Sequence, residues 1–162
     1  MSLYILQRVF WSFKPHIDGF DYCNPVVQVD GNFLTRRYNG TLLTKNGRDD
    51  NCDIFPLAFA IVEGETNEAM IWFFRLLREY VTPQPKVCLI TNRGTTILST
   101  LQSLEVAWEG NGLISVYCIC HVACNFNKRF KNAGLKRHLL NMGTYNNYFS
   151  IFKYNKLCYF VA

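Results

Sequence analysis

The stretch PVVQVDGNF, residues 25–33, decides the fold of this chain, because it is the first segment with the pattern of a buried strand. Val26, Val27 and Val29 form a short apolar run, and a polar turn begins at Asp30. A run of this length that is bounded by turn residues is typical of a strand inside a sheet. We therefore predict a central strand that ends at Asp30.

Two more strands are predicted at short spacing after it. They are GTLLTKN (40–46) and IFPLAFAIV (54–62), with the turn RDDNCD between them. Pro56 lies inside the second of these and indicates a sheet edge or a bulge, because proline has no N–H to donate to a strand ladder. Three short, closely spaced strands favour an antiparallel meander.

A helix is predicted next, at GETNEAMIWFFRLLREYV (64–81). Thr66 is its expected N-cap, and Glu65 lies near the positive end of the helix dipole. Met70 and Phe73 belong to an apolar stripe at helical spacing, which we interpret as core packing. The segment TPQP ends the helix.

Strands and helices alternate in the rest of the pattern. The predicted elements are the strand KVCLIT (86–91), the helix GTTILSTLQSL (94–104), the strand LISVYCICHV (113–122) and the basic helix CNFNKRFKNAGLKRHLLNM (124–142). We expect Thr95 or Thr96 to cap the first of these helices and Gly134 to break the second. The order β-β-β-α-β-α-β-α predicts an α/β fold with a mixed sheet and flanking helices, an order that the ribonuclease H-like fold has.

Length and composition agree with one compact domain that has no membrane partner. The chain has 162 residues, 49% of them hydrophobic, which is enough for one sizeable core. Its longest apolar runs are too short to span a bilayer. Seven cysteines, an odd number, without a signal peptide indicate reduced thiols in the nucleus or cytoplasm.

The charge is divided unevenly along the chain. All 12 acids precede residue 110, whereas 7 of the 17 Lys and Arg residues follow it. The densest group of cations is Lys128, Arg129, Lys131, Lys136 and Arg137. We predict non-specific binding of DNA by this group, weakening steeply with salt, with an ordinary solvated helix as the alternative.

Two places along the chain carry candidate metal ligands. Asp30 ends a central strand, where a carboxylate suits Mg²⁺ or Mn²⁺, although it could instead bond its own backbone in a tight turn. Cys118, Cys120, His121 and Cys124 have soft ligands that suit Zn²⁺. Alternation along the strand would place His121 on the face opposite to the first two cysteines, so buried reduced cysteines are favoured over a zinc site.

Four separated blocks of the sequence carry a family resemblance. They are FKPHIDGFDYCNPVVQVDGNFLTRRYNGTLL, DIFPLAFAIVEGETNEAMIWFFRLL, LITNRG and VYCICHVACNFNKRF. In this order and spacing they resemble the transposase domain of plant Mutator-like elements, the MULE or mudrA-type transposases. The resemblance covers residues 11–142, which leaves 1–10 as a short leader and 143–162 as an irregular tail. It predicts a domain truncated at its carboxyl end.

The resemblance implies a ribonuclease H-like core that cuts and rejoins DNA with Mg²⁺ held by two aspartates and a glutamate. Asp30 matches the first aspartate, and Asn92 stands where the second is expected. Cys118 and His121 match a Cys-x-x-His block that supports the active site. The glutamate is expected after the last strand, but no residue from 110 onward is Asp or Glu.

These departures predict a catalytically inactive domain with weak or absent Mg²⁺ binding, because a neutral amide does not offset the charge of a cation. Glu105 and Glu109 are poor substitutes, since both precede the last strand. The alternatives are a non-catalytic DNA- or protein-binding remnant, of the kind that the FAR-RED-like regulators represent, and a degenerate gene product without function.

Overall fold

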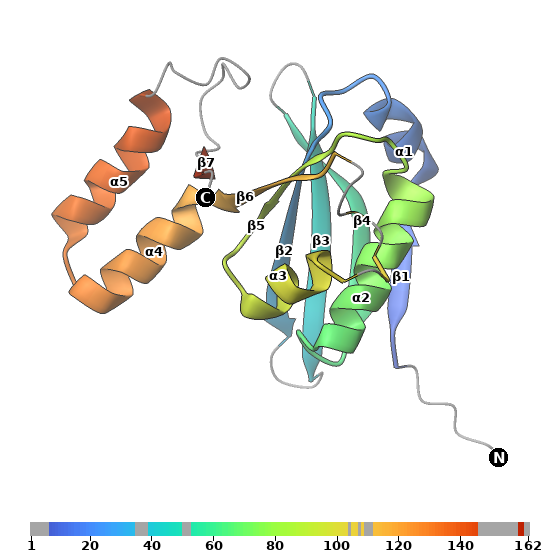
Figure 1. Cartoon of the computed structure of the whole chain (residues 1–162), viewed down its shortest axis with the longest axis horizontal. Coiled ribbons are helices and arrows are strands. Elements are labelled where there is room, and N and C mark those ends of the chain that lie inside the picture. The colour runs from blue at the N-terminus through green and yellow to red at the C-terminus, as the bar shows by residue number, and fades with distance from the viewer. Residues whose placement is uncertain are drawn as a thin grey trace.

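The computed structural model describes residues 7–34, 39–49, 53–103, 105–106, 108, 112–145 and 159–160. Within these residues the strands form one seven-stranded mixed sheet in the order β1-β4-β3-β2-β5-β6-β7 (Figure 1). The strands are β1 (Val9–Ser12), β2 (Val26–Leu34), β3 (Gly40–Arg48), β4 (Ile54–Val62), β5 (Cys88–Thr91), β6 (Ile114–Cys118) and β7 (Tyr159–Phe160). The predicted α/β class with a mixed sheet is confirmed.

The helices complete the architecture. They are α1 (Lys14–Phe20), α2 (Asn67–Leu76), the π-helical turn η1 (Leu77–Val81) that continues α2, α3 (Thr95–Leu101), α4 (Ile119–Phe130) and α5 (Ala133–Tyr145). None of the helices in the described ranges is both long and apolar enough to cross a bilayer. Most of the predicted tail, residues 146–158 and 161–162, lies outside the described part of the chain.

The centre of the sheet is the predicted meander followed by parallel strands. β2, β3 and β4 pair antiparallel in sequence order, whereas β5 pairs parallel with β2 and β6 pairs parallel with β5. In the β3–β4 pairing, Lys45 faces Ala58 and Asn46 faces Pro56, so Leu57 is an extra residue. The bulge predicted at Pro56 is therefore present.

The strand β1 and the helix α1 were not predicted. β1 pairs antiparallel with β4 and takes in Val9 and Phe10, which the sequence analysis assigned to the leader. Phe10 packs edge-on against Trp72 and Phe73 of α2, with ring centroids 6.4 and 6.1 Å apart. This long-range aromatic packing, rather than a local pattern, explains why so short a segment joins the sheet.

The two faces of the sheet differ in what covers them. The face toward α2 and α3 carries the main core, which includes Val27, Val29, Leu43, Phe73 and Phe74. The other face, which we call the open face, carries a smaller buried cluster: Val26, Cys88, Ile90, Val116 and Cys118. In Figure 1, α4 and α5 lie beyond β6, at the edge of the sheet rather than across it.

Three predicted boundaries in the second half of the chain were wrong. β6 ends at Cys118 and α4 begins at Ile119, although the strand was predicted to reach residue 122. The apolar run fits either element, and burial of Ile119 and Ala123 on one helical face decides for the helix. The break after α4 falls at Lys131, which has the left-handed φ of 48°, and not at Gly134.

The third wrong boundary concerns the start of α3. Gly94 is its N-cap residue, and neither Thr95 nor Thr96 caps it. The predicted cap of α2 is confirmed, because the Ala69 N–H donates to Thr66 Oγ1 at 3.2 Å.

Candidate functional site

The strand register brings the two matched acid positions to the same level of the sheet. β2 and β5 run parallel, with Val26 beside Cys88 and Gln28 beside Ile90. Continuing this register by two residues places Asp30 level with Asn92. Since side chains alternate along a strand, Asp30 belongs to the same face as Val26, which is the open face.

Asp30 lies within β2 and not at its end, so the predicted strand end was wrong. It faces Thr44 of β3, whose hydroxyl donates to the Asp30 carbonyl oxygen at 3.4 Å. Asp30 Oδ1 accepts the Gly31 N–H at 3.0 Å. A bond of this kind, from Asp30 to the nearby backbone, was considered in the sequence analysis but placed in a tight turn. The side chain remains 28% exposed, which leaves the carboxylate open to solvent.

Asn92 follows β5 directly and shapes the loop into α3. Its Oδ1 accepts the Gly94 N–H at 2.9 Å, which fixes the two residues before the helix. The side chain is half-buried. An aspartate could accept the same bond, so the geometry at residue 92 does not depend on the amide, but the amide brings no negative charge to the site.

His121 reaches the site from the first turn of α4. Its Nε2 lies 3.7 Å from Asp30 Oδ1, and the ring is 38% exposed. Cys118, the other member of the Cys-x-x-His block, is buried in the open-face cluster at the end of β6. The structure therefore brings His121 to Asp30, whereas Cys118 packs in the buried cluster of the open face. Strand alternation was the wrong argument for His121, because this residue is helical.

Glu65 is a residue that the sequence analysis interpreted only as a helix-dipole charge. A Cβ built at Gly31 would collide with Glu65 Oε1 and would lie 3.3 Å from both Leu43 Cδ2 and Thr41 Cγ2. These neighbours place Glu65 against the main-core face of β2. Burial, and then the charge of Asp30, raise the pKa of the Glu65 carboxyl. Asp30 and Glu65 thus lie near Gly31 on opposite faces of the sheet. The only signal in the sequence for the approach of Glu65 is the glycine that follows Asp30.

The donor set on the open face does not fit a pair of Mg²⁺ ions. It offers one carboxylate, one imidazole and one neutral amide, whereas two-cation phosphoryl-transfer sites need several anionic oxygens. Within the described ranges no three His, Cys, Asp or Glu side chains come together as ligands for a metal ion. Glu105 is exposed, and Glu109 lies outside the described residues.

The four candidate zinc ligands are separated in the structure. Cys118 is buried on β6, and Cys120 and Cys124 are exposed on α4. His121 lies beside Asp30.

Cys88 belongs to the same buried cluster as Cys118. Burial raises the pKa of the Cys88 thiol to about 11, so that this cysteine stays protonated at neutral pH.

The predicted DNA-binding cations share one helical hairpin, α4–α5. Lys128 and Arg129 end α4, Lys131 forms the corner, and Lys136 and Arg137 belong to α5. All are exposed except Lys136, which is half-buried. Asn132 Oδ1 accepts the Leu135 N–H at 2.9 Å at the start of α5, and Phe126 packs on Phe130 within α4.

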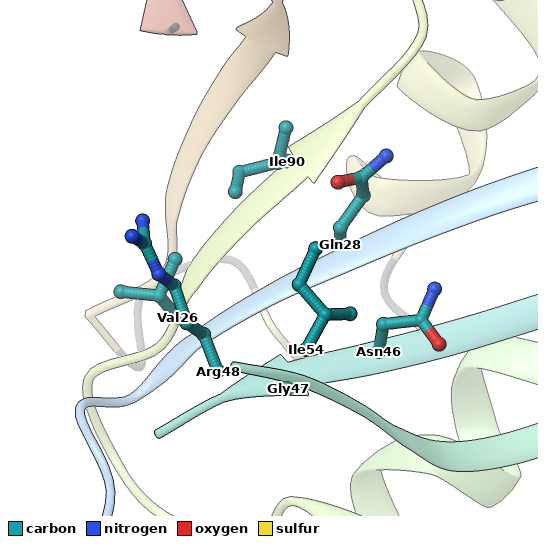
Figure 2. Close-up of a pocket in the computed structure, with 7 residues that line it drawn as sticks. All are labelled: Val26, Gln28, Asn46, Gly47, Arg48, Ile54 and Ile90. Atoms are coloured by element: carbon teal, nitrogen blue, oxygen red, sulfur yellow. The ribbon is translucent and has the colours of Figure 1, made fainter. Parts of the chain in front are cut away.

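A shallow pocket lies on the open face, one row of residues away from Asp30. Gln28 forms its middle, between its cross-strand partners Asn46 and Ile90. Figure 2 shows the amide side chains of Gln28 and Asn46 and the apolar side chain of Ile54 among the residues that line it. The empty volume is about 220 Å³, including space open to solvent. The lining is mixed, and no cationic or anionic pair converges in it.

Comparison with known proteins adds one match. A family model described as the MULE transposase domain matches residues 26–125. The matched range contains Asp30, Asn92, Cys118 and His121 and ends before Lys128. No curated protein matches the chain.

Proposed function

The chain belongs to the MULE transposase domain family, and from this membership we propose that it is a transposase-derived, ribonuclease H-like domain that does not cleave DNA itself. The central strand order β4-β3-β2-β5-β6 supports the fold, because an antiparallel meander is followed by two parallel strands. The position of Asp30 on the strand shared by both halves of the sheet supports its descent from a catalytic aspartate.

One observation carries the proposed loss of activity: the neutral Asn92 directly follows the adjacent parallel strand β5, at the position that the β2–β5 register, continued by two residues, places level with Asp30. At an effective dielectric of about 20, two unit charges 4 Å apart interact by roughly 4 kcal/mol. Because each 1.4 kcal/mol is about tenfold in an equilibrium or a rate, replacing one carboxylate by an amide costs on the order of a thousandfold.

The element that follows the last parallel strand supports the same conclusion. α4 presents His121 to Asp30 and carries no acid, and neither does α5. Near neutral pH an imidazole beside Asp30 adds no negative charge to help hold a cation.

The test is a plasmid nicking and strand-transfer assay with Mg²⁺ or Mn²⁺ on the purified chain and on Asn92→Asp. This substitution keeps an acceptor for the Gly94 N–H, so it should fold. We expect no product above background from either protein, since one restored carboxylate does not replace two. The proposal would be refuted if either protein cleaved DNA in a metal-dependent way and if adding Asp30→Asn abolished that cleavage.

A Mn²⁺ titration of the same proteins checks the electrostatic reason separately. Asn92→Asp should bind Mn²⁺ at least tenfold more tightly than the wild type, because two carboxylates then lie at one level of the sheet. The matched control is Asp30→Asn combined with Asn92→Asp, which should lose the gain. Equal affinity in all three proteins would show that residues 30 and 92 do not share a cation.

The α4–α5 hairpin favours a second candidate function, sequence-independent DNA binding without cleavage. It gathers five cations and no acid within residues 119–145. We infer that these cations contact phosphates, as a regulator of the FAR-RED type would require. We also propose a nuclear location, which such a role would require.

A duplex titration across a range of salt concentrations tests this second candidate. DNA affinity falls as salt rises, and Lys128→Gln combined with Arg129→Gln should make this dependence less steep. The slope of log affinity against log salt should become less negative by up to about 0.9 for each lost phosphate contact. Lys86→Gln, which changes an exposed lysine remote in sequence from the hairpin, is the control. Absence of binding by the wild type at low salt would exclude this function.

A further inference from the structure

A lysine lies in the middle of the main core. Lys45 of β3 is 0% exposed, and its cross-strand neighbours Val29 and Ala58 are buried as well. Burying an ammonium group is strongly unfavourable unless an anion and several acceptors surround it. The surroundings of the Lys45 amine therefore decide its protonation state.

Among the described residues, those surroundings offer a single acceptor and no anion. Lys45 Nζ donates to Thr82 Oγ1 at 2.6 Å and lies 5.7 Å from the centre of the Trp108 ring. Lys45 forms no ion pair with any acid in the described part of the chain. The charge of Arg78, a second cation, acts on Lys45, and the Arg78 guanidinium donates to the carbonyl oxygens of Thr82 and Gln84 at 3.0 and 2.7 Å.

Thr82 connects this amine to the end of the π-helical turn. Its hydroxyl donates to the Leu77 carbonyl at 3.2 Å, so the oxygen's lone pair is available to Lys45. Its backbone N–H donates to the same carbonyl at 2.8 Å. Lys45 thereby links β3 to the end of η1, and its amine lies over the ring of Trp108, which itself packs edge-on against Phe74.

We propose that Lys45 makes this fold acid-sensitive: folding releases its proton, and protonation breaks the packing among β3, the end of η1 and Trp108. The neutral amine satisfies its contact with Thr82 through one N–H. An ammonium would bring three donors to one acceptor beside Arg78, and the face of Trp108 offsets only part of that charge. Acid therefore favours the unfolded chain, in which water solvates the ammonium.

The direction of the pH dependence follows from linkage. Burial, and then the charge of Arg78, lower the pKa of folded Lys45 well below its ordinary value of 10.5. Between the folded-state value and 10.5 the unfolded chain holds the extra proton. The ratio of folded to unfolded protein therefore rises with pH, by up to tenfold for each pH unit. Below the pKa of folded Lys45, the stability that the neutral amine provides is fully lost.

Cys88 acts in the opposite direction at the alkaline end. Its folded-state pKa is raised to about 11 from an ordinary value of 9.0, so its contribution to stability falls as pH rises through that interval. A comparison of variants below pH 9 therefore isolates Lys45.

The experiment is urea unfolding of the full chain from pH 6 to pH 9, with wild type, Lys45→Met and the exposed-lysine control Lys86→Met. Lys45→Met keeps a long flexible side chain without a charge. We expect the folded-to-unfolded ratio of the wild type to rise by up to tenfold per pH unit relative to Lys45→Met, and Lys86→Met to follow the wild type. Parallel pH profiles for wild type and Lys45→Met would overturn the proposal.

Proton uptake by the wild type alone provides an independent measurement in case Lys45→Met does not fold. Calorimetric unfolding at pH 8 in buffers of different ionisation enthalpy reports the number of protons bound. Unfolding should bind close to one proton more than is expected from the other side chains, and this extra proton is the one that Lys45 regains in water. No extra uptake at pH 8 would also overturn the proposal. Neither readout depends on whether the domain binds or cleaves DNA.

Discussion

Gly31 separates the two acids of the candidate site, with Asp30 on the open face of β2 and Glu65 on the main-core face. The absence of a side chain at residue 31 lets the Glu65 carboxylate lie against the strand, where the charge of Asp30 helps to raise its pKa. On the open face, Asn92 and His121 accompany Asp30 without adding negative charge. The electrostatics of the site are thus decided by single residues.

Gly31→Ala should lower the free energy of unfolding by about 1–3 kcal/mol, the usual cost of overpacking. The new Cβ would collide with Glu65 Oε1, and Leu43 Cδ2 and Thr41 Cγ2 would lie 3.3 Å away. Urea unfolding measures the change. Adding Glu65→Ala should recover part of the loss, because it removes the closest atom.

Gly19→Ala is the matched control for this substitution. Gly19 is in α1, and a Cβ there meets nothing within 4 Å. Alanine should stabilise the helix by about 0.5–1 kcal/mol. An equal effect of the two substitutions would mean that Glu65 does not lie against β2.

At the scale of elements, the two helices that cover the main core begin in different ways. Thr66 caps α2 with its own side chain, whereas α3 begins at Thr95 after the N-cap residue Gly94, whose N–H donates to Asn92 Oδ1. The start of α3 is therefore tied to the candidate site, because the residue that shapes its entry lies level with Asp30. The start of α2 is independent of Asn92.

Thr66→Ala should cost about 1 kcal/mol, since it removes the acceptor of the Ala69 N–H. Thr95→Ala is the control, because Thr95 is exposed at the first position of α3 and its side chain makes no cap bond. It should be neutral or slightly stabilising, as alanine has the higher helix propensity. Thermal unfolding followed by circular dichroism gives both values, and a larger loss for Thr95→Ala would contradict the assigned caps.

At the scale of the whole molecule, stability is concentrated on one face of the sheet. The main core lies between the sheet and α2, where Phe74 packs edge-on against Phe73 and Trp108 with ring centroids 5.8 and 5.6 Å apart. In Figure 1 the α4–α5 hairpin lies beyond β6. Its Phe130 is exposed. We expect the hairpin to contribute far less than the α2 layer to the stability of the domain.

Phe74→Ala should cost about 3–5 kcal/mol, because it removes a ring that is 0% exposed and leaves a cavity. Phe130→Ala, at a ring that is 57% exposed, should cost less than about 1 kcal/mol. Urea unfolding of both variants makes the comparison. Similar costs would show that the hairpin is an integral part of the core.

The sequence alone determined what depends on neighbouring residues. The apolar runs and their periods located β2–β6 and α2, Pro56 indicated the bulge, and Thr66 indicated a cap. These signals are local, because strand alternation, helical spacing and capping act over four residues or fewer. The same patterns, with the family resemblance, pointed to Asp30 and Asn92.

The tertiary structure decided what depends on residues that are distant in the chain. The apolar run through Cys118 and His121 fits a strand or a helix, and only packing ended the strand at Cys118. Glu65 at Gly31 and Lys45 at Thr82 are contacts across 34 and 37 residues. No local period encodes such contacts, because they exist only once strand pairing and helix packing have brought the segments together and excluded water from between them.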